Sequence, residues 1–263
     1  MGPLPRDAAA DKPGWRGGAA RGRTAGMTER HDPMTDIPDP LGLRERVLYR
    51  DAATIVLDKP AGIAVHKGPK GGMVLEDGFD ALRFDAPAAP QLAHRLDKET
   101  SGCLVLGRTA KSIAALGKLF ADRGVEKAYW AVVEGGPDGE SGVIEAPLRK
   151  RDAQRGWWMV VDHAGGQPSS TAWKVLGRGG GFTWLELEPI TGRTHQLRIH
   201  SAHMGFPILG DAIYGRAPRT GARLHLHARH IAFTLDGRRV SVEAPVPLHM
   251  TAALSLTGWR PAA

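Results

Sequence analysis

Apolar and β-branched residues recur along the chain mostly in short runs or in alternation, the two patterns typical of β-strands. Strands are predicted at residues 54–57, 63–66, 102–106, 129–133, 157–161, 171–176 and 184–187. A segment containing Pro and Gly, residues 58–62, indicates a turn between the first two. The alternation after residue 128 places Tyr129, Ala131 and Val133 on one face of their strand.

One segment changes to a helical period. In residues 110–123, Ile113, Leu116 and Phe120 recur at the spacing of one helix face, and Gly124 stands where a helix would stop. A helix is therefore predicted there.

A second helix is predicted at residues 194–204, with Gly192 before it and Gly205 after it. Thr194 is expected to cap its N-terminus, where unpaired backbone N–H groups also favour a phosphate.

An Asp236-Gly237 pair separates apolar runs at residues 231–235 and 240–242. A type I′ turn needs positive φ at both central positions, which Asp and Gly tolerate, so this segment predicts a β-hairpin. Many strands, two helices and a hairpin predict an α+β domain with a mainly antiparallel mixed sheet and flanking helices.

Residues 1–40 differ in composition from the rest of the chain. They are rich in Gly, Pro, Ala and Arg, lack an apolar period, and carry six Lys or Arg residues before position 31. Such a segment is predicted to be a disordered basic tail. The remainder, residues 41–263, shows neither an internal repeat nor a second linker and is expected to form one domain.

The overall composition narrows the class of protein. The 263 residues include 35 Lys or Arg against 28 Asp or Glu, and a hydrophobic content of 42% is enough for a sizeable core. A single cysteine excludes a disulfide framework and, with no secretory signal, favours the cytoplasm. No apolar run approaches a membrane span. The formal charge of +7 suits a polyanionic partner such as RNA.

Several catalytic motifs are missing from the sequence. It contains no Gly-x4-Gly-Lys-Ser/Thr phosphate loop, no Gly-x-Gly-x-x-Gly fingerprint and no Gly-x-Ser-x-Gly elbow, so nucleotide hydrolysis and dinucleotide redox chemistry lose support. The histidines at 195, 200, 203, 225, 227 and 230 leave a metal hydrolase as an alternative. Without a His-Glu-x-x-His pattern or a cysteine pair, we expect neither a metal nor a cofactor.

A carboxylate stands among basic and hydroxyl side chains in residues 94–102, on a loop that ends at Gly102 before an apolar strand. Asp97 either caps backbone N–H groups of a polar turn or is kept ionised by nearby positive charge as a nucleophile or base. The polar pattern alone leaves both interpretations open.

Two other segments have a structural and a functional interpretation. The basic residues of 192–200 form either a solvated helix face or a substrate surface. Tyr129 is either a core tyrosine or a ring that stacks on a base and exchanges a proton.

Six segments together resemble the RluA-type RNA pseudouridine synthases, over most of residues 50–247. They occur in that family's order: Lys59-Pro60-Ala61-Gly62-Ile63-Ala64-Val65-His66; His94-Arg95-Leu96-Asp97 through Thr100-Ser101-Gly102; Lys127-Ala128-Tyr129; Gly192-Arg193-Thr194-His195-Gln196-Leu197-Arg198-Ile199-His200; Pro207-Ile208-Leu209-Gly210-Asp211 through Tyr214-Gly215; and Leu224-His225-Leu226-His227-Ala228.

The resemblance implies a pseudouridine synthase fold with a central RNA-binding cleft. It also implies isomerisation of uridine to pseudouridine in ribosomal or transfer RNA, without a cofactor, a membrane or a protein partner. Asp97 matches the family's essential aspartate, which acts either on the anomeric carbon or through an unsaturated sugar. Tyr129 matches its stacking tyrosine, and Arg198 the arginine that pairs with the aspartate, with Arg193 as the rival.

The same motifs imply a substrate-binding set, in which Arg95 holds the RNA with its base extruded. The set comprises Arg95, His94, Arg193, Thr194, His195 and Leu226. A non-catalytic RNA-binding protein with the same fold is the alternative. Many family members carry a small RNA-binding domain ahead of the catalytic one, for which the residues before 41 are too few, so target selection is expected within the catalytic domain.

Overall fold

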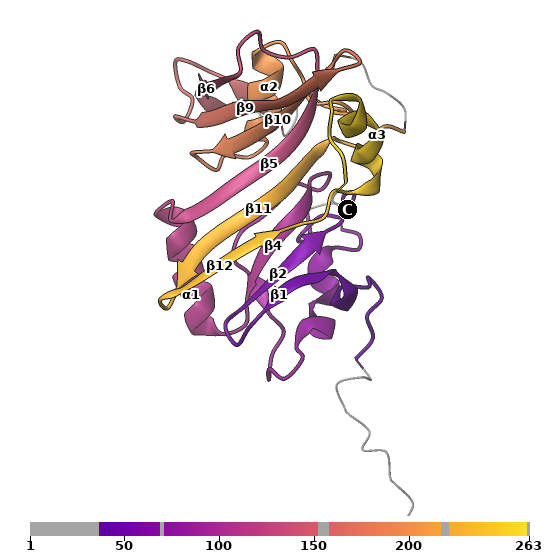
Figure 1. Cartoon of the computed structure of the whole chain (residues 1–263). Helices are drawn as coiled ribbons and strands as arrows, with labels where there is room; N and C mark the ends of the chain where they lie inside the picture. The colour runs from indigo at the N-terminus through magenta and orange to yellow at the C-terminus, as the bar shows by residue number, and fades with distance from the viewer. Residues whose placement is uncertain (1–36, 69–70, 152–157, 217–220, 262–263) are drawn as a thin grey trace, which may run out of the picture.

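A computed structural model describes residues 37–68, 71–151, 158–216 and 221–261 (Figure 1). The strands are β1 (Val47–Arg50), β2 (Thr54–Lys59), β3 (Gln91–Leu92), β4 (Ser101–Gly107), β5 (Val125–Glu134), β6 (Ser141–Glu145), β7 (Leu148–Lys150), β8 (Met159–Val161), β9 (Ser170–Gly179), β10 (Phe182–Pro189), β11 (Leu226–Leu235) and β12 (Arg238–Glu243). The helices are α1 (Ala110–Ala121), α2 (Gln196–His203) and α3 (Leu248–Leu256), with short 3-10 segments η1 (Arg44–Arg46) and η2 (Leu75–Leu82).

One long twisted sheet forms the body of the molecule, in the order β1-β2-β4-β11-β5-β10-β9-β6. β12 pairs with β11, β3 pairs with β4, and β7 and β8 form a separate two-stranded ribbon. Among the described strand pairs only β4 with β11 is parallel, which makes the sheet mixed and mainly antiparallel. The predicted α+β class is confirmed. None of the described helices is long and apolar enough to cross a lipid bilayer.

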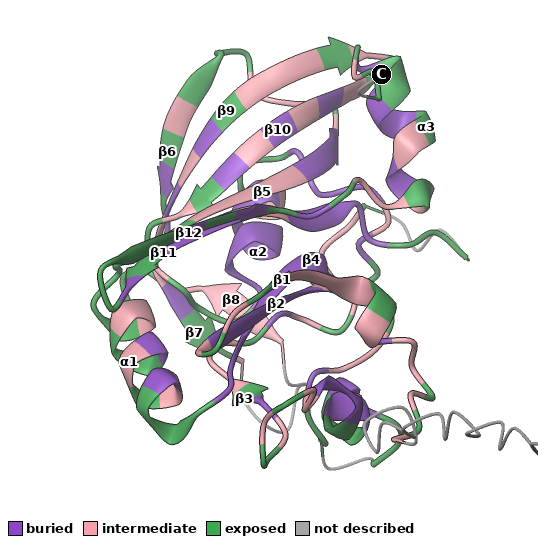
Figure 2. Cartoon of the chain, turned by 60° about the horizontal axis from the view of Figure 1, so that its bottom comes forward, coloured by how far each residue is buried: buried purple, intermediate pink, exposed green. Residues whose placement is uncertain are grey.

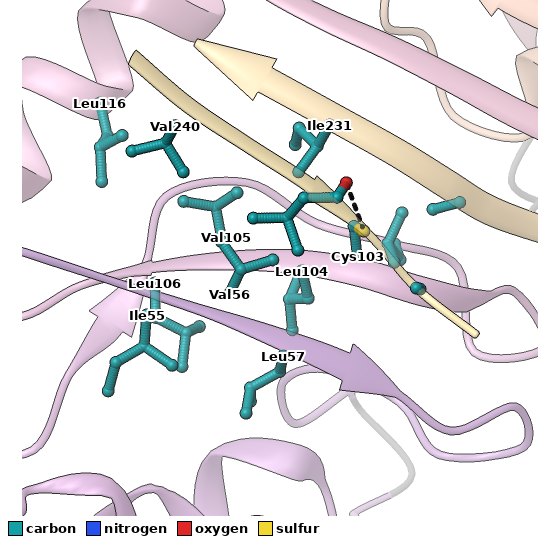
Figure 3. Packing of buried hydrophobic residues seen from close by; sticks show 14 of the residues in the cluster. Ile55, Val56, Leu57, Cys103, Leu104, Val105, Leu106, Leu116, Ile231 and Val240 are labelled. Carbon is teal, nitrogen blue, oxygen red and sulfur yellow. Dashed lines mark hydrogen bonds between the residues drawn. The ribbon is translucent and has the colours of Figure 1, made fainter. Parts of the chain in front are cut away.

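The main core lies around β4, all seven residues of which are buried. Figure 3 shows side chains of β2 and β4 packed with Leu116 of α1 and with Ile231 and Val240 of the β11–β12 hairpin. Cys103 lies in this core, where its thiol donates to the carbonyl of Val242 at 3.6 Å, and burial raises its pKa to about 12. The apolar run of β4 is continuous because both of its faces are covered.

Gly102 lets β4 approach β11 closely. Its φ is +102°, and a Cβ at this position would meet the carbonyl oxygen of Ala228 at 2.3 Å. Gly102 and Ala228 are partners in the short parallel ladder that joins the two strands. A glycine is therefore required at the point where the predicted Asp97 loop enters the sheet.

The hairpin predicted at residues 231–242 is confirmed, with φ of +48° at Asp236 and +76° at Gly237. The helix predicted at 110–123 is also confirmed. Thr109 caps it by accepting the N–H of Ser112, and the helix ends at Ala121.

The strand predicted at residues 63–66 is wrong, because this segment is a loop. The carbonyls of Ala64 and Val65 accept the N–H groups of Leu75 and Glu76 at the start of η2, so they do not join a strand ladder. Of the strand predicted at 157–161, residues 159–161 are strand β8 and residue 157 lies outside the described part.

Residues 1–36 of the predicted tail lie outside the described residues. Its last residues are described and contact the domain. The Asp39 carboxylate accepts the N–H groups of Leu43 and Arg44, and the Arg44 guanidinium donates to the carbonyl of Ile37.

Candidate active site

A cleft of about 740 Å³ opens between the loop before β4, strand β5, the end of α1 and the N-terminal half of α2. All nine residues predicted from the sequence line it. They are Asp97, Tyr129, Arg198, Arg95, His94, Arg193, Thr194, His195 and Leu226. The structure therefore brings segments from four distant parts of the chain to one place.

A buried lysine fixes the loop that carries Asp97. Lys59, the last residue of β2, has no exposed surface, and its ammonium donates to the carbonyls of Pro60 at 2.8 Å and Lys98 at 3.1 Å. The N–H of Gly62 also donates to the Lys98 carbonyl, at 2.9 Å. Strand β2 and the turn that follows it are thus tied to the residue next to Asp97.

This lysine predicts a pH dependence of stability. Burial lowers the pKa of Lys59 from 10.5 to about 8, although nearby carboxylates including Asp97 oppose the shift. Between these values the unfolded chain holds a proton that the folded chain lacks. The free energy of unfolding should therefore rise with pH across this window, by up to about 3 kcal/mol. Urea unfolding of the wild type and Lys59→Met at several pH values measures this rise. Parallel profiles for the two proteins would contradict it.

The Asp97 carboxylate faces two basic side chains of α2. Its Oδ2 lies 3.7 Å from Nη1 of Arg198 and 3.8 Å from Nε2 of His195, and the side chain is 26% exposed. Both contacts exceed hydrogen-bonding distance, and among the described residues no hydrogen bond ends on this carboxylate. Its oxygens are held near positive charge and open toward the cleft. Arg198, and not Arg193, provides the nearby guanidinium.

Arg198 has a closer partner than the expected one. Its Nε and Nη2 form a bidentate pair with Asp211, at 2.8 and 2.7 Å, and both side chains are almost fully buried. Asp211 also accepts the N–H groups of Ile213 and Tyr214. Burial opposes ionisation, but the guanidinium and these N–H groups together lower the pKa of Asp211. The expected simple Asp97–Arg198 pair is therefore a triad, in which Asp211 orients the arginine.

The expected cap at Thr194 is wrong. Helix α2 begins at Gln196, and the residue before it, His195, has a left-handed backbone with φ of +53°. Thr194 is exposed on the preceding loop. The Gln196 side chain closes this turn by accepting the N–H of Arg193 at 3.0 Å.

His195 is oriented by a tyrosine. Its Nδ1 lies 2.9 Å from the hydroxyl of Tyr214, and that hydroxyl accepts the N–H of Met159 at 3.0 Å. A hydroxyl proton directed at Nδ1 leaves the ring proton on Nε2. This tautomer is favoured because a lone pair on Nε2 would face the Asp97 carboxylate. Burial lowers the pKa of His195 even though Asp97 opposes the shift.

Tyr129 and Leu226 line the cleft together with Asp97. Tyr129 lies on β5, opposite Ala228 of β11 and Leu187 of β10. Burial, followed by the charge of Asp97, raises the pKa of Tyr129, so the phenol keeps its proton at neutral pH. The two side chains give the cleft an apolar surface against which a planar base can lie.

His94 links the Asp97 loop to strand β4 and helix α1. Its Nε2 accepts the N–H of Val105 at 3.0 Å, and its ring stacks on Phe120 of α1 with centroids 4.4 Å apart. Burial lowers the pKa of His94 to about 3, so the ring is neutral. The predicted substrate-binding residue is therefore also a structural link between α1 and the Asp97 loop.

The histidines that suggested a metal have other partners. His200 contacts Thr171 and the carbonyl of Ala146, and His227 contacts Ser101. Of the two interpretations of residues 192–200, the solvated helix face does not apply to α2, because this helix is buried from Gln196 to Ser201 (Figure 2).

The lining of the cleft is strongly basic. Among the described residues that line it, Asp97 is the only acid, against six basic residues: Arg95, Lys98, Arg123, Lys127, Arg193 and Arg198. A groove of this charge attracts the backbone of a nucleic acid.

Three residues of the site were not assigned roles from the sequence: Lys59, Asp211 and Tyr214. Each of the three lies within one of the six motif segments. The order of motifs along a chain, however, does not show which residues are buried or which of them are in contact. The role of Asp211 is the hardest of the three to predict from the sequence. Its partner Arg198 lies thirteen residues earlier, and the end of a helix and a turn separate the two.

Comparisons with known proteins agree with this architecture. The sequence profile of a family described as RNA pseudouridylate synthase matches residues 53–203. An uncharacterized RNA pseudouridine synthase of Zymomonas mobilis is 38% identical over 212 residues, covering 80% of this chain and 97% of the relative. Ribosomal large subunit pseudouridine synthase C of Vibrio cholerae is 34% identical over 235 residues, covering 85% and 72%.

The fold has a solved counterpart. The structure of human RNA pseudouridylate synthase domain containing 4 superposes with a TM-score of 0.69 at 27% identity, covering 81% of this chain and 93% of that one. The fold and these matches define an enzyme of the RNA-modifying class, an isomerase. The chain belongs to the RNA pseudouridylate synthase family.

Proposed function

We propose that this enzyme isomerises specific uridines of large-subunit ribosomal RNA, with Asp97 as its central catalytic residue. The observation that carries the proposal is the position of Asp97. It is the only carboxylate among the described residues lining a basic cleft, and it stands 3.7 Å from a buried guanidinium.

The reaction needs a protein side chain that acts on the ribose of the target uridine. The bond between C1′ and N1 breaks, uracil turns, a bond forms between C1′ and C5, and the proton on C5 leaves while N1 gains one. Nothing is oxidised, and no group is donated. Asp97 can attack C1′ or remove a proton from C2′ to give an unsaturated sugar, and its open carboxylate supports both routes.

Arg198 stabilises negative charge at Asp97 before and after each step. Its own orientation is fixed by Asp211, so the positive charge is held in place without reorganisation during the reaction. The neutral imidazole of His195 directs its Nε2 proton at the same oxygen.

Tyr129 offers a ring for the detached or extruded base. Because the pKa of Tyr129 is raised, the phenol acts as a hydrogen-bond donor in the resting site, which leaves Asp97 as the better acceptor of the C5 proton. Stacking is worth about 1–3 kcal/mol per base, which offsets part of the cost of taking a uridine out of its stack.

Ribosomal RNA is the favoured target because several relatives at 34–36% identity are named ribosomal large subunit pseudouridine synthase C. The test maps pseudouridine in all RNA of cells with and without the gene, followed by incubation of the purified enzyme with unmodified large-subunit transcripts. Sites in ribosomal RNA that vanish in the deletion and return in vitro are expected. Loss of sites only in transfer RNA would overturn the choice of target, and no lost site at all would overturn the enzymatic role.

A further inference from the structure

The end of helix α1 has an unusual backbone. After Ala121 the chain forms a Schellman turn, in which the N–H of Gly124 donates to the carbonyl of Leu119 at 2.8 Å. The left-handed position of this turn, normally a glycine, is occupied by Arg123 with φ of +61°. A residue with a Cβ is disfavoured there, although a glycine stands one position further on.

The strained residue places its charge at the cleft. Arg123 is exposed and lines the cleft, and its guanidinium makes no hydrogen bond or ion pair with another described residue. Its interaction with the C-terminal end of the helix does not explain the strain, because Lys118 already supplies a cation in the last turn with ordinary helical geometry. The position therefore suits a ligand outside the chain.

A second cation lines the same cleft. Lys127 of β5 is half-buried two residues before Tyr129, and it too has no acidic partner among the described residues. Burial lowers its pKa. A half-buried ammonium without a carboxylate gains from an external anion, and Asp97 is the sole acid of the described lining.

The helix that carries Arg123 is fixed relative to the Asp97 loop. Phe120, three residues before Arg123, stacks on His94, which stands three residues before Asp97. Helix α1 and the Asp97 loop are therefore held together, so a group bound by Arg123 is kept in register with the nucleotide at Asp97.

We propose that Arg123 and Lys127 form a binding site for a backbone phosphate of the RNA, next to the target nucleotide. Arg123 provides a planar donor fork and Lys127 a point charge, a combination that suits a phosphodiester. The proposal rests on RNA being the substrate, but not on the role proposed for Asp97.

The test measures RNA binding and stability in the same variants. The probe is a fluorescein-labelled oligouridylate of about 16 nucleotides, titrated by anisotropy at several salt concentrations. Arg123→Gly should raise the Kd about 3–10-fold at low salt and reduce the slope of log Kd against log salt by about 0.7. The same change should raise Tm by about 2–4 °C, because glycine adopts the left-handed backbone freely.

Two variants complete the design. Arg123→Lys keeps a cation and should bind the oligonucleotide within about twofold of the wild type. Arg238→Ala removes an exposed charge of β12 outside the cleft lining and controls for net charge. An unchanged Kd and slope in Arg123→Gly, or a loss no larger than in Arg238→Ala, would overturn the proposal. Since the assay scores binding, its failure differs from a failure of catalysis by Asp97.

Discussion

Asp97→Asn is expected to abolish pseudouridine formation, lowering kcat by at least about 10³-fold, while the protein still folds and binds RNA. The amide has nearly the same shape but can neither attack C1′ nor take a proton. Its effect on RNA binding should be small or favourable, because it removes the only acid from the described lining of a basic cleft. Single-turnover assays of pseudouridine formation, with anisotropy for binding, measure the two quantities.

The matched control is Glu99→Gln, the same chemical change two residues along the loop, at a carboxylate that does not line the cleft. It should keep turnover near that of the wild type. Turnover by Asp97→Asn comparable to that of Glu99→Gln would refute the catalytic role of Asp97.

Asp211→Ala is expected to lower the free energy of unfolding by about 3–5 kcal/mol, because it leaves the Arg198 guanidinium buried without its bidentate partner. The N–H groups of Ile213 and Tyr214 also lose their acceptor. The turnover rate should also decrease, because Arg198 no longer has a fixed orientation toward Asp97. Urea unfolding followed by fluorescence gives the stability.

A double variant separates stability from catalysis. Arg198→Met with Asp211→Leu removes both charges and fills a similar volume, so it should recover much of the lost stability but none of the turnover. A free energy of unfolding for Asp211→Ala within about 1 kcal/mol of the wild-type value would contradict the stabilising role assigned to the buried Arg198–Asp211 pair.

The central strands of the sheet, from β2 to β9 in its order, and the hairpin could be predicted because their signals are local. The Asp236-Gly237 turn needs only two residues with positive φ, and the apolar run of β4 needs only its own sequence. The cleft residues could be collected from the sequence because they lie in ordered motifs. Their convergence on one cleft is a fact of the fold, and their roles remain predictions.

What could not be predicted depends on contacts between distant segments. Residues 63–66 have the composition of a strand, but the carbonyls of Ala64 and Val65 accept hydrogen bonds from η2, which the sequence pattern did not reveal. Thr194 is a good capping residue, yet the left-handed backbone at His195 moves the helix start beyond it. Burial of Lys59 and of the Arg198–Asp211 pair contradicts the usual exposure of charged residues, so no composition rule would find it.

The place of β11 in the sheet constrains how the molecule is made. This strand, near the end of the sequence, lies between β4 and β5, and Asp97 and Tyr129 come from the segments on its two sides. A ribosome must therefore synthesise the chain through residue 235 before β4 and β5 can be joined through β11. Until β11 has been made, the edges of β4 and β5 that pair with it have no partner strand, and the segments that carry Asp97 and Tyr129 are not joined through the sheet.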